Sequence, residues 1–208
     1  KGRSADALVV ATGYIESRRQ ARIGARATGR IEKVNVEEGS KVKTNDVLAV
    51  LEHADLDASL AAVRAMASRS NTEILEQNVE IQRAERDFAR AEKGFASNAL
   101  TPADFDEFRF KRDAALARKA SLEAAQQLAE ARVREAEQLL ENMFVRAPFD
   151  GTVISKDAEL GESILPGGMG EASGRGSVVT IADLDHLEVD SDVKEDFISR
   201  ISEGQSAE

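Results

Sequence analysis

A short sequence unit occurs twice in this chain, with a long and unrelated segment between the copies. The first copy is GRIEKVNVEEGSKV (29–42) and the second is GTVISKDAELGESI (151–164). Each copy begins with a glycine, has a second glycine at the same offset and then an aliphatic residue. The runs that follow also correspond, VLAVLE (47–52) with SVVTIAD (177–183). Neither copy is apolar enough to form a core alone, and a stable sheet needs about three strands. We therefore expect the copies to be two halves of one β-unit, with chance similarity as the alternative.

The segment between the copies has the pattern of a coiled coil. Residues 55–95 contain no proline and are rich in residues that favour helix, and Asp55 or Asp57 is expected to cap the helix start. A seam repeated every seven residues predicts packing against a second helix. Its two columns are Leu60, Ala67, Ile74, Ile81, Phe88 and Phe95, and Leu56, Val63, Ser70, Gln77, Ala84 and Ala91.

The stretch SNALTPADF (97–105) interrupts this helix and starts another. Thr101 is a suitable N-cap, and Pro102 suits the first helical position. A second helix is expected to run to about Met143, with its own heptad column of Phe108, Ala115, Leu122, Ala129, Ala136 and Met143. Two long helices joined by a few residues lie antiparallel, so the sequence predicts a narrow hairpin roughly 60 Å long.

The outer segments have the character of strands and loops. Residues 7–23 predict two short strands or one bent strand, and Val145 begins strand chemistry again after the hairpin. The loop LPGGMGEASGRG (165–176) is expected to be flexible because of its glycines. The segment 187–205 predicts a strand followed by a short helix or turn.

Composition excludes several classes of function. The net charge of −10 argues against a surface that binds nucleic acid. The absence of cysteine excludes disulfides and thiolate metal sites. The longest apolar run near the start, ALVVA, is too short to cross a membrane. Because the chain starts at Lys1 and stops without a closing signal, we expect it to be part of a longer protein.

No catalytic or metal-binding constellation is recognisable. His53 and His186 stand at similar points after the two halves, without the accompanying ligands of a metal site. No nucleophile elbow occurs, and GGMGEASGRG lacks the lysine of a phosphate-binding loop. The sequence predicts a protein that is not an enzyme and that has no catalytic residues, metal or cofactor.

Two stretches, ATGRIEKVNVEEGSKVKTNDVLAVLEHADL (27–56) and VRAPFDGTVISKDAELGESI (145–164), resemble the periplasmic adaptor family. This is the membrane fusion protein or HlyD-like family of tripartite efflux pumps and type I secretion systems. The resemblance implies an α+β fold, in which a long antiparallel coiled-coil hairpin is inserted in a lipoyl-like (biotinyl/lipoyl) β-sandwich beside part of a β-barrel domain. The implied divisions are barrel strands in 1–25, half-motifs in 26–54 and 145–184, the hairpin in 55–144 with its tip at about 95–102, and more of the barrel in 185–208.

The resemblance also implies a function. Members of this family link an inner-membrane transporter, of the RND or ABC type, to a TolC-type outer-membrane channel. They assemble as homo-oligomers, commonly hexameric rings, in the periplasm. The anchor to the inner membrane would lie in segments missing from this chain. The alternative is a structural coiled-coil scaffold without a transport partner. A lipoyl or biotin carrier is disfavoured, because LEHADLDAS (51–59) has no lysine where a carrier has one.

Family members dock the hairpin tip on the channel through an arginine, a leucine four residues later and a serine eleven residues later. The matching residues here are Arg90, Gly94 and Thr101, so the leucine is missing and the hydroxyl is kept. Phe95 and Leu100 are expected to be exposed apolar anchors beside them. The expected docking residues are therefore Arg90, Gly94, Phe95, Leu100 and Thr101.

Overall fold

The computed structural model describes residues 12–166, 176–193 and 203–204. The chain forms two compact units, one of residues 1–52 with 144–208 and the other of residues 53–143. The expectations for residues 7–11, for most of the loop 165–176 and for residues 194–202 lie outside the described residues.

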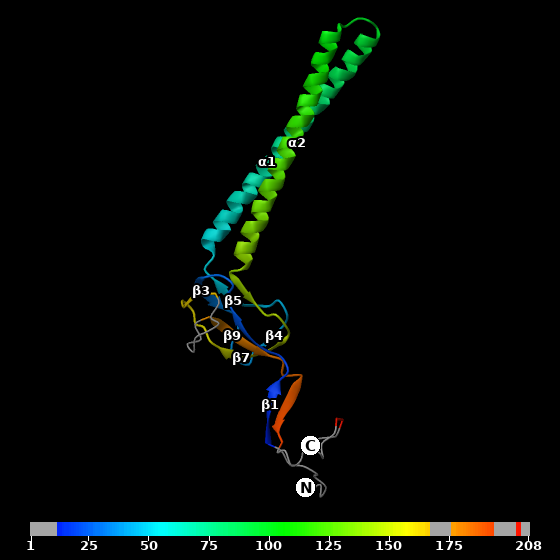
Figure 1. Cartoon of the computed structure of the whole chain (residues 1–208). Helices are drawn as coiled ribbons and strands as arrows, with labels where there is room; N and C mark the ends of the chain where they lie inside the picture. Colours follow the sequence, from blue (N-terminus) through cyan, green and yellow to red (C-terminus); the bar gives the residue numbers. More distant parts are fainter. Residues whose placement is uncertain (1–11, 167–175, 194–202, 205–208) are drawn as a thin grey trace. The chain divides into compact units, whose positions relative to one another are not determined.

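In the first unit, two four-stranded sheets combine the two copies of the repeat (Figure 1). Their strands are β2 (Gln20–Gly24), β3 (Gly29–Val34), β4 (Lys41–Val42), β5 (Val47–Leu51), β6 (Phe144–Arg146), β7 (Gly151–Lys156), β8 (Ser163–Ile164) and β9 (Ser177–Ala182). One sheet has the order β2-β9-β7-β4 and the other β6-β5-β3-β8. Each sheet takes strands from both copies, as expected for the two halves of one β-unit.

The pairing between the copies is reciprocal. Gly29 of β3 pairs with Ile164 of β8, and the equivalent Gly151 of β7 pairs with Val42 of β4. The connecting turns make equivalent bonds as well. The Gly161 N–H donates to the Ile31 carbonyl at 2.9 Å, and the Gly39 N–H donates to the Val153 carbonyl, also at 2.9 Å. The two halves are therefore related by an approximate twofold, and neither completes its strand pairing alone.

The second glycine of each copy has a backbone requirement. Gly39 has φ +83° and Gly161 has φ +82°, in the left-handed region that residues with a Cβ disfavour. A Cβ added at either position would have open space around it, so backbone conformation rather than packing selects glycine there. This explains why the glycine offset is the same in both copies.

The core of this unit is aliphatic and closed. Its largest fully buried side chains come from both copies: Ile31, Leu48, Leu51, Val153, Ile164, Val178, Val179 and Ile181. Burial of a side chain of this size contributes about 1.5–3 kcal/mol. Because the copies share the core, the unit has no stable half.

A two-stranded sheet of β1 (Thr12–Ser17) and β10 (Leu187–Asp192) completes the described strands. Ile15 pairs with Val189, and both side chains are mostly exposed. These two strands fall in the segments expected to belong to a β-barrel. The segment 1–25 also includes β2, but β2 pairs with β9 in the sandwich rather than with β1 or β10.

The second unit is a hairpin of two helices, α1 (Ala54–Ala96) and α2 (Pro102–Glu141), which lie side by side in Figure 1. At 1.5 Å per residue each spans roughly 60 Å. The expected seam of α1 is correct: its positions are buried or half-buried, apart from Phe95 at the tip. α2 presents two columns to this seam, the expected one and a second of Phe105, Arg112, Lys119, Gln126, Val133 and Leu140.

The expected helix cap was wrong. The N-cap of α1 is His53 and makes no side-chain capping bond, while Asp55 and Asp57 lie in the first turn. Carboxylates at that place still favour the positive end of the helix dipole. α2 ends at Glu141, slightly before the expected Met143.

Polar side chains fix the alignment of the two helices. Gln77 donates to the Ala115 carbonyl at 2.9 Å, and Gln126 donates to the Asn71 side chain at 2.6 Å. A slip of one helix along the other would leave these polar groups without partners, which costs more than an apolar mismatch.

Candidate functional site

The loop at the hairpin tip has a defined hydrogen-bonded structure. Asn98 adopts φ +56° just beyond the end of α1, and its N–H donates to the Phe95 carbonyl at 3.0 Å. The Ala99 N–H donates to the Gly94 carbonyl at 2.8 Å. This pair of bonds is the Schellman pattern, with asparagine in place of the usual glycine. The tip is therefore held by backbone bonds rather than left as an open connection.

Thr101 begins α2 as expected, and its hydroxyl is used twice within the chain. It accepts from the Asp104 N–H at 3.2 Å and donates to the Asp104 carboxylate at 2.6 Å. Pro102 occupies the first helical position. The hydroxyl's proton is thus engaged, which leaves the oxygen with acceptor capacity for a partner.

Gly94 and Leu100 are packed together across the loop. A Cβ built on Gly94 would lie 2.8 Å from Leu100 Cδ1, closer than a real Cβ contact allows. Leu100 is half-buried, not fully exposed as expected from the sequence. The absence of a side chain at position 94 therefore gives Leu100 room to lie against α1, and an apolar group is retained over this position.

Three phenylalanines form the base of the tip. The Phe95 and Phe105 rings stack with centroids 4.9 Å apart, and Phe88 lies 5.5 Å from Phe105. The Arg112 guanidinium lies over the Phe88 ring at 4.1 Å. Phe95 remains 41% exposed, as expected from the sequence. The sequence interpretation missed Phe105 as the supporting partner, although its position three residues before Phe108 is a helix-face signal.

Arg90 lies on α1 between Phe88 and Phe95 in the sequence and is open to solvent. Its side chain is 78% exposed and forms an ion pair with Asp87. A surface pair of this kind contributes little to stability. Of the five expected residues, Gly94, Phe95, Leu100 and Thr101 belong to the loop and its flanks, and Arg90 lies beside them on α1.

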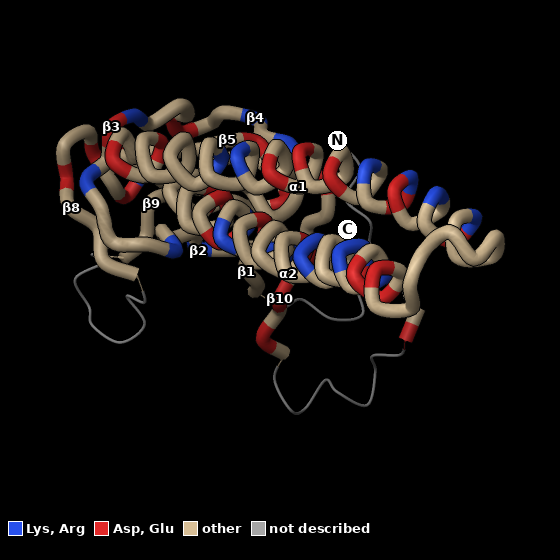
Figure 2. The backbone as a smooth tube through the Cα atoms, turned by 90° about the horizontal axis from the view of Figure 1, so that it is seen from above, with Lys and Arg blue, Asp and Glu red and all other residues tan. Residues whose placement is uncertain are grey.

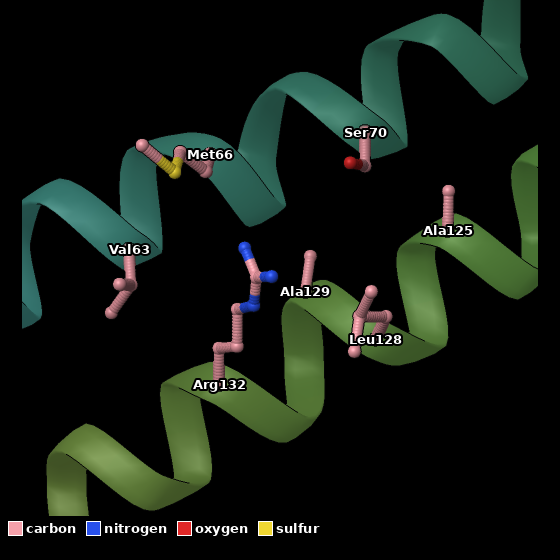
Figure 3. A pocket seen from close by; sticks show the side chains of 7 residues that line it. All are labelled: Val63, Met66, Ser70, Ala125, Leu128, Ala129 and Arg132. Carbon is pink, nitrogen blue, oxygen red and sulfur yellow. The ribbon is translucent and has the colours of Figure 1, made fainter.

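The grooves along the hairpin are shallow. One of about 180 Å³ lies between α1 and α2 and is shown in Figure 3. In that view the Arg132 side chain rises from α2 into the space beside Val63 and Met66. Sites for drug-sized ligands are typically 300–1,000 Å³. This groove is therefore too small to be a site for such a ligand.

The two histidines pair with acids nearby. His53 Nε2 lies 3.4 Å from an Asp57 carboxylate oxygen, and His186 Nδ1 lies 2.9 Å from Asp183 Oδ2. Burial raises the pKa of Asp183, but hydrogen bonds from His186 and the Asp185 N–H outweigh it, so the net direction is downward.

The described part of the chain contains neither a candidate metal site nor a helix suited to crossing a membrane. In residues 12–166, 176–193 and 203–204, no three His, Cys, Asp or Glu side chains gather as a metal site requires. No helix described there has both the length and the apolar character to cross a membrane.

A family model for the CzcB-like barrel-sandwich hybrid domain matches residues 19–167. Among curated proteins, the chain is similar to the macrolide export protein MacA of Yersinia pestis, with 23% identity over 96% of this chain and 52% of that protein. It is also similar to the pyoverdine export membrane fusion protein PvdR of Pseudomonas aeruginosa, with 26% identity over 98% of this chain and 51% of that protein. The chain therefore spans about half the length of these relatives.

Solved structures show the same fold. The crystal structure of MacA from Actinobacillus actinomycetemcomitans has a TM-score of 0.79 and 25% identity, and it covers 95% of this chain and 59% of its own. The membrane fusion protein Spr0693 from Streptococcus pneumoniae R6 has a TM-score of 0.61 at 17% identity, covering 93% of this chain and 72% of its own. The second likeness supports the fold alone.

Proposed function

This chain belongs to the family of membrane fusion proteins with a CzcB-like barrel-sandwich hybrid domain, and from this premise we propose that it is part of a periplasmic adaptor. The adaptor links an inner-membrane transporter, of the RND or ABC type, to a TolC-type outer-membrane channel. It acts without chemistry of its own, as one member of a homo-oligomeric, hexameric ring. Its inner-membrane anchor lies in the remainder of the protein.

The observation that carries this proposal is the ordered hairpin tip. A hairpin of two helices of 43 and 40 residues ends in a loop closed by backbone bonds, with Arg90 and Phe95 exposed beside it. A rigid tip lets exposed groups meet a partner without a large ordering cost. Arginine and aromatic side chains are also the residues that most often anchor protein interfaces.

The tip residues have distinct roles in this proposal. Arg90 donates to exposed helix-end carbonyls of the channel, which lack partners within their own helix. Phe95 supplies the apolar anchor, and Leu100, lying over Gly94, supplies the apolar contact for which other family members use a leucine in the helix. Thr101 offers its remaining acceptor capacity.

The sandwich supports an assembly role rather than a carrier role. In the chain, β5 is followed at once by α1, where a carrier would have its modified lysine. The names of the relatives refer to export and membrane fusion, which does not favour a scaffold without a transport partner. Because those names refer to different cargoes, macrolides and pyoverdine, they do not support a particular substrate.

The test is complementation of a strain that lacks the gene, with the complete protein at equal abundance in the cell envelope. Wild-type protein is expected to restore resistance to at least some members of a panel of export substrates. Arg90→Asp is expected to reduce the restored resistance by about tenfold or more, since it replaces a donor to the channel's carbonyl oxygens with a carboxylate that these oxygens repel. Arg134→Asp, an exposed position on α2 away from the tip, is the matched control. Loss of the gene without any change in export would contradict the adaptor function.

A further inference from the structure

The face of α1 opposite the seam is basic near the tip. Arg83, Arg86, Arg90 and Lys93 follow one another at spacings of three and four residues, so they form one row along the helix. All four are exposed. Figure 2 shows blue bands on successive turns of α1 towards the loop. These four residues are called the basic row below.

The basic row is unusual in this chain, because the net charge of the whole is −10. Closer to the start of α1, the same face consists of Ala58, Ala62 and Ala65. Like charges three and four residues apart repel each other and destabilise a helix by tenths of a kcal/mol per pair. Without a partner, the row therefore has a cost that the alanines do not.

Pairing inside the chain offsets only part of this repulsion. Arg90 has its ion pair with Asp87. In the described part of the chain, Arg83, Arg86 and Lys93 form no ion pair. Three of the four cations are thus available to an external anion.

The helix dipole does not account for the row. A cation is favoured near a helix C-terminus, but the effect is confined to about the last turn. Lys93 lies in the last turn of α1, which ends at Ala96. Arg83 and Arg86 lie more than two turns before that end, where the dipole gives no such benefit.

The surroundings of the row indicate which kind of partner it fits. Glu85 and Glu92 lie along one side, and Glu80 and Asp87 along the other. A groove of about 290 Å³ is lined by Arg83 and Lys111 together with Ala84, Phe108 and Ala115. An anionic bilayer or a nucleic acid would be repelled by the flanking acids, whereas a protein surface can match both signs of charge.

We propose that the basic row is a docking surface for a partner protein, the outer-membrane channel assigned above, whose surface presents carboxylates to the row and basic groups to the acids beside it. This rests on the proposed function and adds Arg83, Arg86 and Lys93 to the contact with the channel. The row covers roughly 15 Å of helix, so the contact extends from the tip down the side of α1. The acids beside it select against partners with a uniform negative charge.

The experiment measures binding of the complete adaptor to the purified TolC-type channel of the same organism, by surface plasmon resonance. The test variant is Arg83→Glu/Arg86→Glu, which leaves Arg90 unchanged. The matched control is Arg118→Glu/Arg134→Glu, which makes the same change of charge at exposed α2 positions without ion pairs in the described residues. Arg83→Gln/Arg86→Gln provides a second test without new charges, and helix content by circular dichroism checks the fold of each variant.

We expect the Glu test variant to bind the channel at least about tenfold more weakly than the control does. The affinity of the Gln variant should lie between these two. Wild-type binding should weaken between about 50 and 300 mM salt, with a smaller salt effect in the Gln variant. Equal binding by the test variant and the control would overturn the docking role of the basic row while leaving the adaptor function intact. No wild-type binding to the channel would overturn both.

Two further probes separate the alternative partners. Vesicles containing phosphatidylglycerol and a DNA duplex are offered to wild-type protein and to the test variant. We expect no binding that depends on the row in either case. Binding to one of them that is lost in the test variant, with channel binding unchanged, would overturn the protein partner in favour of that probe.

Discussion

In the β-sandwich the apolar side chains meet in a closed core, whereas in the hairpin they form one half-open seam. Leu48, Leu51 and Ile181 are fully buried in the sandwich. In the described part of the hairpin, the buried residues of α1 are Leu60, Ile81 and Ala91. None of the described residues of α2 is buried. The sandwich thus has the larger share of hydrophobic stabilisation, and the hairpin presents most of its side chains to its surroundings.

This difference shows why the two units suit different tasks. A closed core fixes one arrangement of strands and tolerates little change in side-chain volume. The hairpin seam includes Arg112, Lys119 and Gln126, so its stability depends on side chains with long apolar stems and polar ends. The outer faces of the hairpin can therefore carry charged residues, as at the basic row, without loss of the fold.

The largest effect is expected from a matched leucine pair. Leu48→Ala should destabilise the sandwich by about 2–5 kcal/mol, because it removes a fully buried side chain and leaves a cavity. Leu122→Ala in α2 should cost roughly 1 kcal/mol, because half-burial gives a smaller transfer loss. Native-state hydrogen exchange of amides in β5 and in α2 measures the two opening free energies separately. Equal costs would show that the seam is as well packed as the core.

A second comparison is between the two halves of the sandwich. Gly39→Ala and Gly161→Ala should each cost about 1–2 kcal/mol, because each forces a Cβ into the left-handed region. Since neither added Cβ meets a neighbouring atom, the two costs should be nearly equal. Exchange of the β3 and β7 amides provides the measurement. A cost at one position only would show that the twofold relation of the turns does not extend to their energetics.

Local patterns predicted the fold because they have a direct physical origin. Gly39 and Gly161 are required by the same turn conformation, and the heptad columns of α1 predicted a seam that the structure confirms. The second column of α2 was missed because Arg112, Lys119 and Gln126 read as surface residues. Their long apolar stems allow them to lie in the seam, as Arg112 does with its guanidinium over the Phe88 ring.

The candidate site was less accessible to sequence reasoning. Leu100 fills the space over Gly94 because a turn in the chain brings residues on opposite sides of the loop together. Helix periodicity does not predict such a contact, because Gly94 belongs to α1 and Leu100 to the loop between the two helices. The predicted cap at Asp55 or Asp57 was wrong for a related reason. Capping preferences are worth about 1 kcal/mol, and the strand that ends at Leu51 fixes where the helix begins.

The smallest predicted effect concerns a link between the two halves that is sensitive to pH. The Thr44 hydroxyl donates to the Asp150 carboxylate at 2.6 Å, and the Thr44 N–H donates to the same oxygen. These bonds, the hydroxyl's first, lower the pKa of Asp150, with Lys43 adding a smaller attraction. A carboxyl group whose pKa is lowered by folding stabilises the folded state above its unfolded pKa, which is about 3.9. That contribution is lost as the pH falls from there through the lower, folded pKa.

Asp150→Asn should therefore reduce the loss of sandwich stability on acidification below about pH 4, and it should have its main effect on stability above that pH. The exposure of Asp150 keeps the effect small, because solvent screens its interactions. Thr44→Val removes the hydroxyl but keeps the backbone donor, so it should give a change of the same sign and smaller size. Asp55→Asn, in the first turn of α1, is the control in the hairpin. Exchange of the β4 and β7 amides from pH 3 to 6, corrected for intrinsic rates, separates the two units. If Asp150→Asn leaves the pH profile of the sandwich unchanged, the link between Thr44 and Asp150 does not help to hold the two halves together.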